Sequence, residues 1–353
     1  MIKHSHKAFD ALALLSGGLD SILAARLVQE QGIRVLGLHF VSPFFGKPHK
    51  LAQWEERYNI PITAVDVSEE FVNMLCKGPR HGLGKTLNPC VDCKILMLST
   101  AREMLGVFRA GFIISGEVLG QRPMSQRLDA LNIIKRDSGV KNILVRALSA
   151  RRLPPTDPEV KGIINREKLG SISGRGRKEQ LQLAEKFNIR PIPTPGGGCL
   201  LTEKEAAKRY LPLFRHIQKP RPGDFYLANT GRQIWNYNHW LCIGRNEDDN
   251  LRLNELAGDE DYLFSLTDFP GPLGLGRTVN GKKWSPETIK SAAALVNRFS
   301  PKSRQSNRQV KVLVKQGGTS QELLTRPQDP EEATLWTEPI WDRDEAKFIA
   351  TQD

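Results

Sequence analysis

A short glycine-rich segment, Ser16-Gly-Gly-Leu-Asp-Ser21, constrains the fold of this chain more than any other feature. It follows an apolar run at residues 11–15, typical of a buried strand, and precedes residues 22–31, which have the pattern of a helix. A strand, a glycine turn and a helix together form a phosphate site, because glycines admit the anion to the backbone and N–H groups at the helix start point toward it. The carboxylate of Asp20 is suited to hold the Mg²⁺ that accompanies a nucleotide.

The same segment lacks the lysine that directly follows the glycines in loops that transfer a phosphoryl group. This absence favours a loop that holds a pyrophosphate leaving group. The pattern resembles the PP-loop of the N-type ATP pyrophosphatases, which adenylate a substrate with ATP and release pyrophosphate. The resemblance implies ATP and Mg²⁺ as cofactors, held by Ser16, Gly17, Gly18, Asp20 and Ser21.

Apolar runs alternate with segments long enough for helices through the first half of the chain. The runs are residues 11–15, 34–40, 62–67 and 111–115, with 142–147 as a fifth candidate. This alternation predicts an α/β fold with a parallel sheet covered on both faces and ligands at the carboxyl ends of its strands. With the PP-loop, it indicates an adenine nucleotide alpha hydrolase-like (HUP) domain. Because the loop after the second run should border the nucleotide, His39 is a predicted contact.

The predicted domains are residues 1–202, the PP-loop domain; 203–321, a smaller basic α+β domain; and 322–353, an acidic polar tail. A connector rich in proline and glycine, residues 190–199, ends the first domain. Thr202-Glu-Lys-Glu205 predicts a capping box and a helix to about residue 217. Further along, the pattern predicts a helix at 286–299 and a basic strand at 309–315.

Three of the five cysteines have a setting that suits chemistry. Cys90 and Cys93 lie about one helical turn apart, and Cys199 follows three glycines. These three thiols would either bind a 4Fe-4S cluster through three irons, or carry a persulfide on one thiol that another resolves as a disulfide. Half of a structural zinc site and inert thiols are further alternatives. Cys76 and Cys242 lie in apolar contexts, which predict small hydrophobic side chains.

A second motif, Ser115-Gly-Glu-Val-Leu-Gly-Gln121 followed by Ser125-Gln126, comes after the fourth apolar run. Its glycines would let backbone approach a ligand, and Glu117 and Gln121 are candidates to orient ATP or a target base. With the PP-loop, this pattern resembles the tRNA 4-thiouridine synthetases and, more distantly, the tRNA 2-thiouridylases, over roughly residues 9–202.

That resemblance implies ATP-dependent thiolation of a tRNA uridine, with adenylation of a uracil carbonyl oxygen before sulfur transfer. Asp20, Cys90, Cys93 and Cys199 would be catalytic, and the three cysteines would also be the metal ligands of a cluster. Gly116 and Gln121 would lie at the nucleotide. The sulfur donor would be a cysteine desulfurase or free sulfide.

The charge of the chain indicates a polyanionic partner. Its formal net charge is +12; residues 122–182 hold fourteen Lys/Arg against six Asp/Glu, and residues 288–321 hold seven Lys/Arg and no acid. Ile243-Gly-Arg-Asn-x-x-Asp-Asn250, with the later basic stretch, resembles the NFACT-R (DUF814-type) domain, a presumed RNA binder. Trp235, Tyr237 and Trp240 are available for stacking on unpaired bases, with a role in the core as the alternative.

No apolar stretch approaches the roughly 18 residues of a membrane span, and an odd number of cysteines is typical of a reducing compartment, so the expected location is the cytoplasm. The number of associating chains stays open, a homodimer being one option. Two other functions compete with thiolation. One is an ATP-dependent amidotransferase or ligase acting on a small molecule, and the other is a non-catalytic RNA-binding factor that uses the loop as a switch.

Overall fold

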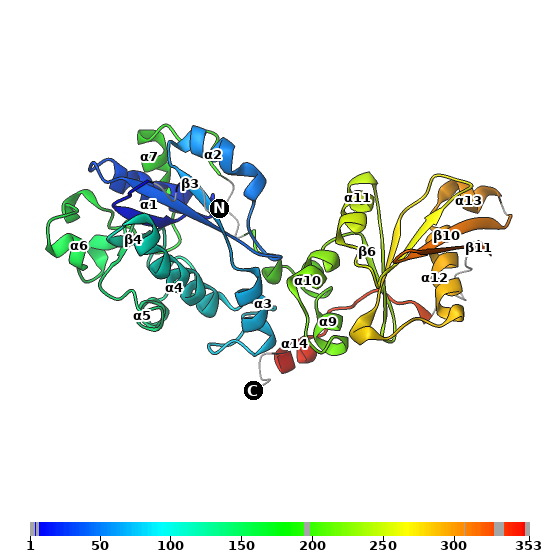
Figure 1. Cartoon of the computed structure of the whole chain (residues 1–353). Helices are drawn as coiled ribbons and strands as arrows, with labels where there is room; N and C mark the ends of the chain where they lie inside the picture. Colours follow the sequence, from blue (N-terminus) through cyan, green and yellow to red (C-terminus); the bar gives the residue numbers. More distant parts are fainter. Residues whose placement is uncertain (1–3, 5–6, 194–197, 307, 328–334, 350–353) are drawn as a thin grey trace. The chain divides into compact units, whose positions relative to one another are not determined.

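The computed structural model describes residues 4, 7–193, 198–306, 308–327 and 335–349. The described residues divide into two compact units, one within Met1–Thr202 and the other within Glu203–Ile349. Figure 1 shows a parallel sheet with helices in the first unit and a large antiparallel sheet in the second. Among the described residues, none of the helices has the length and apolar character that a membrane crossing requires.

The first unit is built on a five-stranded sheet in the order β3-β2-β1-β4-β5, with every pair parallel. Its strands are β1 Ala11–Leu14, β2 Val35–Val41, β3 Ile62–Asp66, β4 Phe112–Ser115 and β5 Leu144–Arg146. Its α-helices are α1 Leu19–Gln29, α2 Leu51–Tyr58, α3 Ser68–Cys76, α4 Cys90–Phe108, α5 Leu128–Asp137, α6 Asp157–Val160 and α7 Lys178–Lys186. The predicted parallel α/β fold is confirmed.

Helices cover both faces of this sheet, which explains why its strands are continuously apolar. Alternate residues of β1 enter different cores, since successive side chains of a strand point to opposite faces. Ala11 and Ala13 pack in the core that contains α1 and α7, whereas Leu12 and Leu14 pack in the core that contains α4. The strand order reverses between β1 and β4, and ligands of such sheets bind outside the carboxyl ends at that point.

The second unit contains a six-stranded antiparallel sheet in the order β11-β10-β8-β9-β7-β6. Its strands are β6 Arg232–Asn236, β7 His239–Ile243, β8 Tyr262–Leu266, β9 Gly274–Arg277, β10 Val310–Gln316 and β11 Thr319–Thr325. Its α-helices are α8 Lys204–Ala207, α9 Leu211–His216, α10 Pro222–Ala228, α11 Glu247–Leu256, α12 Pro286–Arg298, α13 Pro301–Ser306 and α14 Arg343–Ile349. The predictions of a helix at 286–299 and a strand at 309–315 are confirmed by α12 and β10.

The apolar side of α12 packs on this sheet and forms the core of the second unit with buried tryptophans. Ser285 caps α12, because its hydroxyl accepts a hydrogen bond from the Thr288 amide at 3.2 Å. Trp336, from the distal part of the chain, is 7% exposed in the same core. Thr337 pairs with Trp235 of β6 through backbone hydrogen bonds of 2.8 Å. The described residues near the carboxyl end are therefore integral to this unit.

The prediction of one helix from the capping box at residue 202 to about residue 217 is wrong. The structure has a short 3-10 turn at Leu200–Thr202 and then two separate helices, α8 and α9. Thr202 caps no helix, because its hydroxyl donates to the Cys199 carbonyl at 2.7 Å. Pro212 lies in the first turn of α9, where its missing N–H is harmless, whereas inside a longer helix it would remove a hydrogen bond.

Candidate functional site

The Ser16–Ser21 loop connects β1 to α1, and its own hydroxyls hold its shape. Ser21 Oγ donates to the Gly18 carbonyl at 2.7 Å, and the Gly18 amide donates to Ser16 Oγ at 3.3 Å. Gly17 has a φ of +79°, and a Cβ there would collide with the ring of Trp54. Helix α1 begins at Leu19, three residues earlier than the predicted start at residue 22, so Asp20 and Ser21 lie in its first turn.

The second motif lies directly against this turn. A Cβ on Gly116, which follows β4, would come within 2.5 Å of the Asp20 carbonyl oxygen and 2.7 Å of the Ser21 amide nitrogen. Only glycine permits this approach. Further along the motif, Gln121 Nε2 donates to Asp20 Oδ2 at 3.1 Å. The structure therefore brings together four of the predicted nucleotide-site residues, Asp20, Ser21, Gly116 and Gln121.

Burial raises the pKa of Asp20, and this effect is opposed by the hydrogen bond from Gln121 and by the charges of Arg177 and Arg122. Its second carboxylate oxygen, Oδ1, is buried and has no hydrogen-bond partner among the described residues. A buried polar atom without a partner costs about 1–3 kcal/mol, so such atoms indicate a missing ligand or ion. A carboxylate with one unpaired, buried oxygen suits Mg²⁺, which binds to one or two carboxylates and keeps waters and phosphate oxygens.

Other unpaired polar atoms lie in the same region. Gln180 of α7 is fully buried and close enough to Asp20 to lower the pKa of that carboxyl, although its amide nitrogen and oxygen meet no full hydrogen-bond geometry among the described residues. The side-chain oxygen of Gln121, which contacts Asp20 through its amide nitrogen, is also buried and unpaired among these residues. Asp20, Gln121 and Gln180 together form a candidate polar binding site.

Sequence reasoning missed Gln180, Arg177 and Arg122 as individual site residues. They reach Asp20 because the backbone of Ser173 forms a bridge with Leu119, and the Gly174 amide donates to the Leu119 carbonyl at 2.7 Å. The signal was present as Ser173-Gly-Arg-Gly-Arg177, a basic glycine-rich segment directly before a helix. The positive charge that the loop itself lacks therefore comes from two arginines distant in sequence.

Glu117 is a structural residue in this motif, contrary to the expectation that it orients ATP or a base. Its carboxylate accepts hydrogen bonds from Arg146 Nε at 2.9 Å and Ser115 Oγ at 3.0 Å. The two charged side chains are 2% and 5% exposed. Burial would raise the pKa of Glu117, but the charges of Arg146 and Lys94 outweigh it and lower the pKa. The ion pair connects the loop after β4 to β5.

His39 lies at the end of β2, buried beside Trp54 with 5.3 Å between ring centroids. Its Nε2 accepts a hydrogen bond from the Lys47 amide at 2.8 Å, so Nδ1 carries the proton and donates to the Leu15 carbonyl at 2.8 Å. Burial lowers the pKa of this imidazole, which favours the neutral form. These contacts join the end of β1 to the loop after β2, a positioning role; direct contact with a nucleotide stays a prediction.

The three candidate cysteines lie near one another. Cys90 is the first residue of α4, Cys93 lies one turn further, and each of these two and Cys199 is partly exposed. Burial raises the pKa of the Cys93 thiol, and the neighbouring Cys199 and Cys90 raise it further. A backbone hydrogen bond next to Cys199 fixes its position: the Leu200 amide donates to the Phe44 carbonyl at 2.9 Å.

The thiols also border the second motif. Asn88 Nδ2 donates to Cys90 Sγ at 3.1 Å and contacts Met124 Sδ at 3.6 Å, and Met124 lies three residues after Gln121. Within the described residues, no three His, Cys, Asp or Glu side chains are arranged as a metal-binding group. The cluster stays a prediction, and no step below passes through one. The connector residues 194–197, part of the predicted Pro-Gly-Gly-Gly-Cys segment, lie outside the described residues.

In the second unit, two of the three predicted stacking residues are core residues. Trp235 and Trp240 are 5% and 0% exposed and stack on each other with 5.1 Å between centroids. The prediction that these two are available to bases is wrong, because both side chains are buried in the core of the second unit. Tyr237, in the turn between β6 and β7, is 80% exposed.

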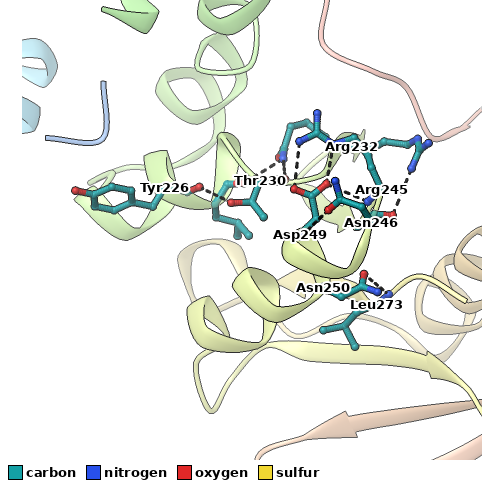
Figure 2. Close-up of polar contacts among 11 residues, drawn as sticks. Tyr226, Thr230, Arg232, Arg245, Asn246, Asp249, Asn250 and Leu273 are labelled. Atoms are coloured by element: carbon teal, nitrogen blue, oxygen red, sulfur yellow. Dashed lines mark hydrogen bonds and ion pairs between the residues drawn. The ribbon is translucent and has the colours of Figure 1, made fainter. Parts of the chain in front are cut away.

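The Gly244-Arg245-Asn246 motif folds around the start of α11 (Figure 2). Asn246 caps the helix by accepting a hydrogen bond from the Asp249 amide at 2.8 Å. The Asp249 carboxylate in turn accepts hydrogen bonds from Arg245 Nε at 2.7 Å and Nη2 at 3.2 Å. Asn250 Oδ1 accepts from the Leu273 amide at 2.9 Å and fills the space that a Cβ on residue 244 would need. The motif therefore fixes the position of the Arg245 guanidinium.

The fold and this site define a PP-loop ATP-using domain joined to a separate antiparallel-sheet domain. Residues 7–150 match the family model described as thiamine biosynthesis protein (ThiI), and residues 231–337 match the model described as NFACT protein RNA binding domain. The chain thus carries a ThiI-family domain followed by an NFACT-type RNA-binding domain, which confirms both resemblances.

Curated relatives are tRNA thiolation enzymes. The chain is 24% identical to a tRNA-specific 2-thiouridylase MnmA of Psychromonas ingrahamii over 71% of this chain and 74% of that protein. It is 31% identical to a probable tRNA sulfurtransferase of Thermococcus kodakarensis, over 36% of this chain and 34% of that protein. A predicted subunit of tRNA methyltransferase from Methanocaldococcus jannaschii has a TM-score of 0.28 at 11% identity, covering 37% of this chain and 66% of that one, too weak a likeness to support an inference.

Gly116→Ala should abolish nucleotide binding while the unit still folds. The added methyl group would push against the backbone of Asp20 and displace the first turn of α1. Gly106→Ala is the matched control, since a Cβ at this helical position of α4 meets nothing within 4 Å and should stabilise by about 0.5–1 kcal/mol. Binding of MgATP measured by calorimetry checks both variants. An undiminished affinity in Gly116→Ala would contradict the packing argument.

Asp20→Asn should raise the melting temperature of the free protein at pH 7. Because burial holds the pKa of Asp20 above its ordinary 3.8, the folded state binds its proton more tightly than the unfolded state. Stability is therefore lost as pH rises through the folded pKa, and the variant escapes this loss. Melting curves at pH 7 and below pH 3.8 check the direction of this effect. The difference in melting temperature between the variant and the wild type should vanish in acid. A variant less stable than wild type at pH 7 would contradict it.

Proposed function

We propose that this protein uses ATP to thiolate a uridine in tRNA. The observation that supports the proposal is a pair of contacts in one unit: Gln121 donates to Asp20, and Met124, three residues further along, contacts Asn88, which donates to Cys90. A uracil carbonyl oxygen is a poor leaving group. Attack of this oxygen on the α-phosphorus of ATP expels pyrophosphate and leaves an adenylated carbon, which sulfur then attacks with AMP as the leaving group.

The glycine-rich loop would hold the pyrophosphate, and Asp20 would hold Mg²⁺ through its unpaired oxygen. Mg²⁺ when bound supplies charge for the leaving phosphates. Arg177 and Arg122, whose charges reach Asp20, would neutralise the same phosphates and supply what the lysine of other phosphate loops provides. Gln121 and Gln180 would orient the carboxylate and the nucleotide, since both have buried amide atoms without partners among the described residues.

Sulfur would reach the uridine through the thiols of Cys90, Cys93 and Cys199. In the persulfide route, the terminal sulfur on one cysteine attacks the adenylated carbon and AMP leaves. A second cysteine then attacks the protein-bound sulfur, which forms a protein disulfide and frees the thiolated uracil. A cysteine desulfurase charges the first thiol by passing on the sulfane sulfur of its own persulfide, and a cellular thiol reductant opens the disulfide; free sulfide would instead attack the adenylated carbon directly. Since the raised pKa of Cys93 keeps it protonated, Cys90 or Cys199 is the better acceptor of incoming sulfur.

The partner would be tRNA, bound in part by the NFACT-type domain. Lysine and arginine side chains of the segment 288–321, which contains no acidic residue, supply charge for its phosphates. This partner separates thiolation from the other functions considered, because a small-molecule ligase needs no RNA and a non-catalytic factor releases no AMP.

The decisive experiment is tRNA-dependent turnover. Incubation of the protein with ATP, Mg²⁺, a cysteine desulfurase with cysteine, a thiol reductant and unmodified tRNA should release AMP and pyrophosphate, and mass analysis of the digested tRNA should show a thiouridine. Comparison of the chromatographic retention time of the product with those of 2-thiouridine and 4-thiouridine standards identifies which oxygen was replaced. Asp20→Asn should reduce AMP formation by about a hundredfold or more, since loss of a charge at the phosphates costs several kcal/mol. Release of AMP without any change in the tRNA would overturn thiolation.

Serine at Cys90, Cys93 or Cys199 should stop thiolation but leave tRNA-dependent AMP formation in place, since adenylation precedes sulfur transfer. Cys76→Ser and Cys242→Ser are matched controls; Cys242 is buried in the other unit, where its thiol donates to Gln233 at 3.1 Å. Alkylation and mass spectrometry of protein charged by a cysteine desulfurase and cysteine should locate a persulfide on one of the three. A brown anaerobic preparation with stoichiometric iron, bleached by the same serine substitutions, would contradict the persulfide route.

A further inference from the structure

The second unit contains a cavity of about 830 Å³ that borders the Gly244-Arg245-Asn246 motif. It is lined by residues from β6, the start of α11, the junction of α12 and α13, and the segment around Trp336. A cavity of this size is in the range that takes a small ligand or one element of a larger one.

Four arginines line this cavity: Arg232, Arg245, Arg298 and Arg304. Two acidic residues, Glu247 and Glu338, line it as well, so positive charge exceeds negative charge by two. The Arg245 guanidinium is fixed by Asp249, as Figure 2 shows. In the described part of the chain, Arg298 and Arg304 have neither an ion pair nor a side-chain hydrogen bond, so their donors are available to an anion.

One side of the cavity is aromatic. The Arg232 guanidinium lies over the Phe299 ring, 4.8 Å from its centroid, and donates to the Gly244 carbonyl at 3.3 Å. Trp336 and Ile234 add apolar surface. A flat guanidinium held on an aromatic ring is a surface on which an unpaired base stacks.

Buried hydrogen bonds hold the part of the cavity that carries the free arginines. Asn297, immediately before Arg298, is fully buried; its amide donates to Thr325 Oγ1 at 3.1 Å, and its oxygen accepts from Ser303 Oγ. Ser300 Oγ donates to the Pro270 carbonyl at 2.9 Å. These bonds fix the backbone of the turn between α12 and α13, which carries Arg298, Phe299 and Arg304. These side chains therefore lose less conformational entropy when a ligand binds.

We propose that this cavity binds a single-stranded segment of RNA, with a phosphate between Arg298 and Arg304 and a base against Arg232 and Phe299. The proposal rests on the proposed function, in that the RNA would be the tRNA substrate. Arginine suits both parts of such a ligand, because its planar fork binds phosphate oxygens and its face stacks on bases. An acidic peptide would use the charges but leave the stacking surface unused.

The test measures binding of an unmodified tRNA by the full-length protein at several salt concentrations. Arg298→Ala/Arg304→Ala should weaken binding about tenfold or more and lower the log–log salt slope by about 0.7, the value for the one phosphate contact that is lost on a single strand. Lys282→Ala/Lys283→Ala removes two exposed charges that do not line the cavity, and it should change the affinity by about twofold or less. Equal losses in both variants would overturn the assignment to the cavity.

A gain of affinity provides a second readout in case the double arginine variant folds poorly. Glu338→Gln removes a negative charge from the lining and should tighten tRNA binding, whereas Asp259→Asn, at an exposed position outside the lining, should not. Short single-stranded RNA should displace the tRNA, and an RNA duplex of equal length should not. Equal displacement by both, or displacement by an acidic peptide instead, would overturn the proposal.

The outcomes separate this proposal from the proposed function. A wild-type protein that binds no tRNA would refute the function and the cavity together. A wild-type protein that binds and thiolates tRNA, with an unchanged affinity and salt slope in Arg298→Ala/Arg304→Ala, would refute the cavity alone. MgATP binding by the first unit should be the same in all variants.

Discussion

The predicted nucleotide site depends on the close approach of two backbone segments at the carboxyl ends of neighbouring strands. Gly116, after β4, lies so near the Asp20 carbonyl and the Ser21 amide that no side chain fits between them. This contact places Gln121 within hydrogen-bonding distance of the Asp20 carboxylate. The parallel order of β1 and β4 brings the segments to the same edge, and the two glycine motifs make the contact possible.

The sequence was sufficient for the architecture of the first unit because its signals are local. Buried parallel strands are continuously apolar, and the glycine loop between β1 and α1 has few structural alternatives. The start of α1 was placed three residues late, since Leu19 and Asp20 follow glycines and carry no distinctive capping pattern. At α8 and α9 the capping pattern predicts one helix, but Pro212 lies at the start of a separate second helix.

Site residues supplied by long-range contacts could not be predicted in the same way. Arg177 and Gln180 reach Asp20 only because residues 173–174 pair with Leu119, a contact that no spacing in the sequence encodes. Glu117 had the position of a ligand-binding residue, yet its carboxylate pairs with Arg146, 29 residues further along the sequence. Trp235 and Trp240 had the composition of a base-stacking surface, but the register of β6 and β7 places them inside the sheet.

The two candidate sites differ in how the polar groups that form them are satisfied, and this difference bears on how each would bind. In the first unit, Asp20, Gln121 and Gln180 have buried atoms without partners among the described residues, so the free protein carries a cost that a bound ion and nucleotide would remove. In the second unit, Asn246, Asp249, Asn250 and Asn297 are hydrogen-bonded to neighbouring protein groups, and the arginines stand on rigid backbone. Ligand binding should therefore stabilise the first unit more than the second.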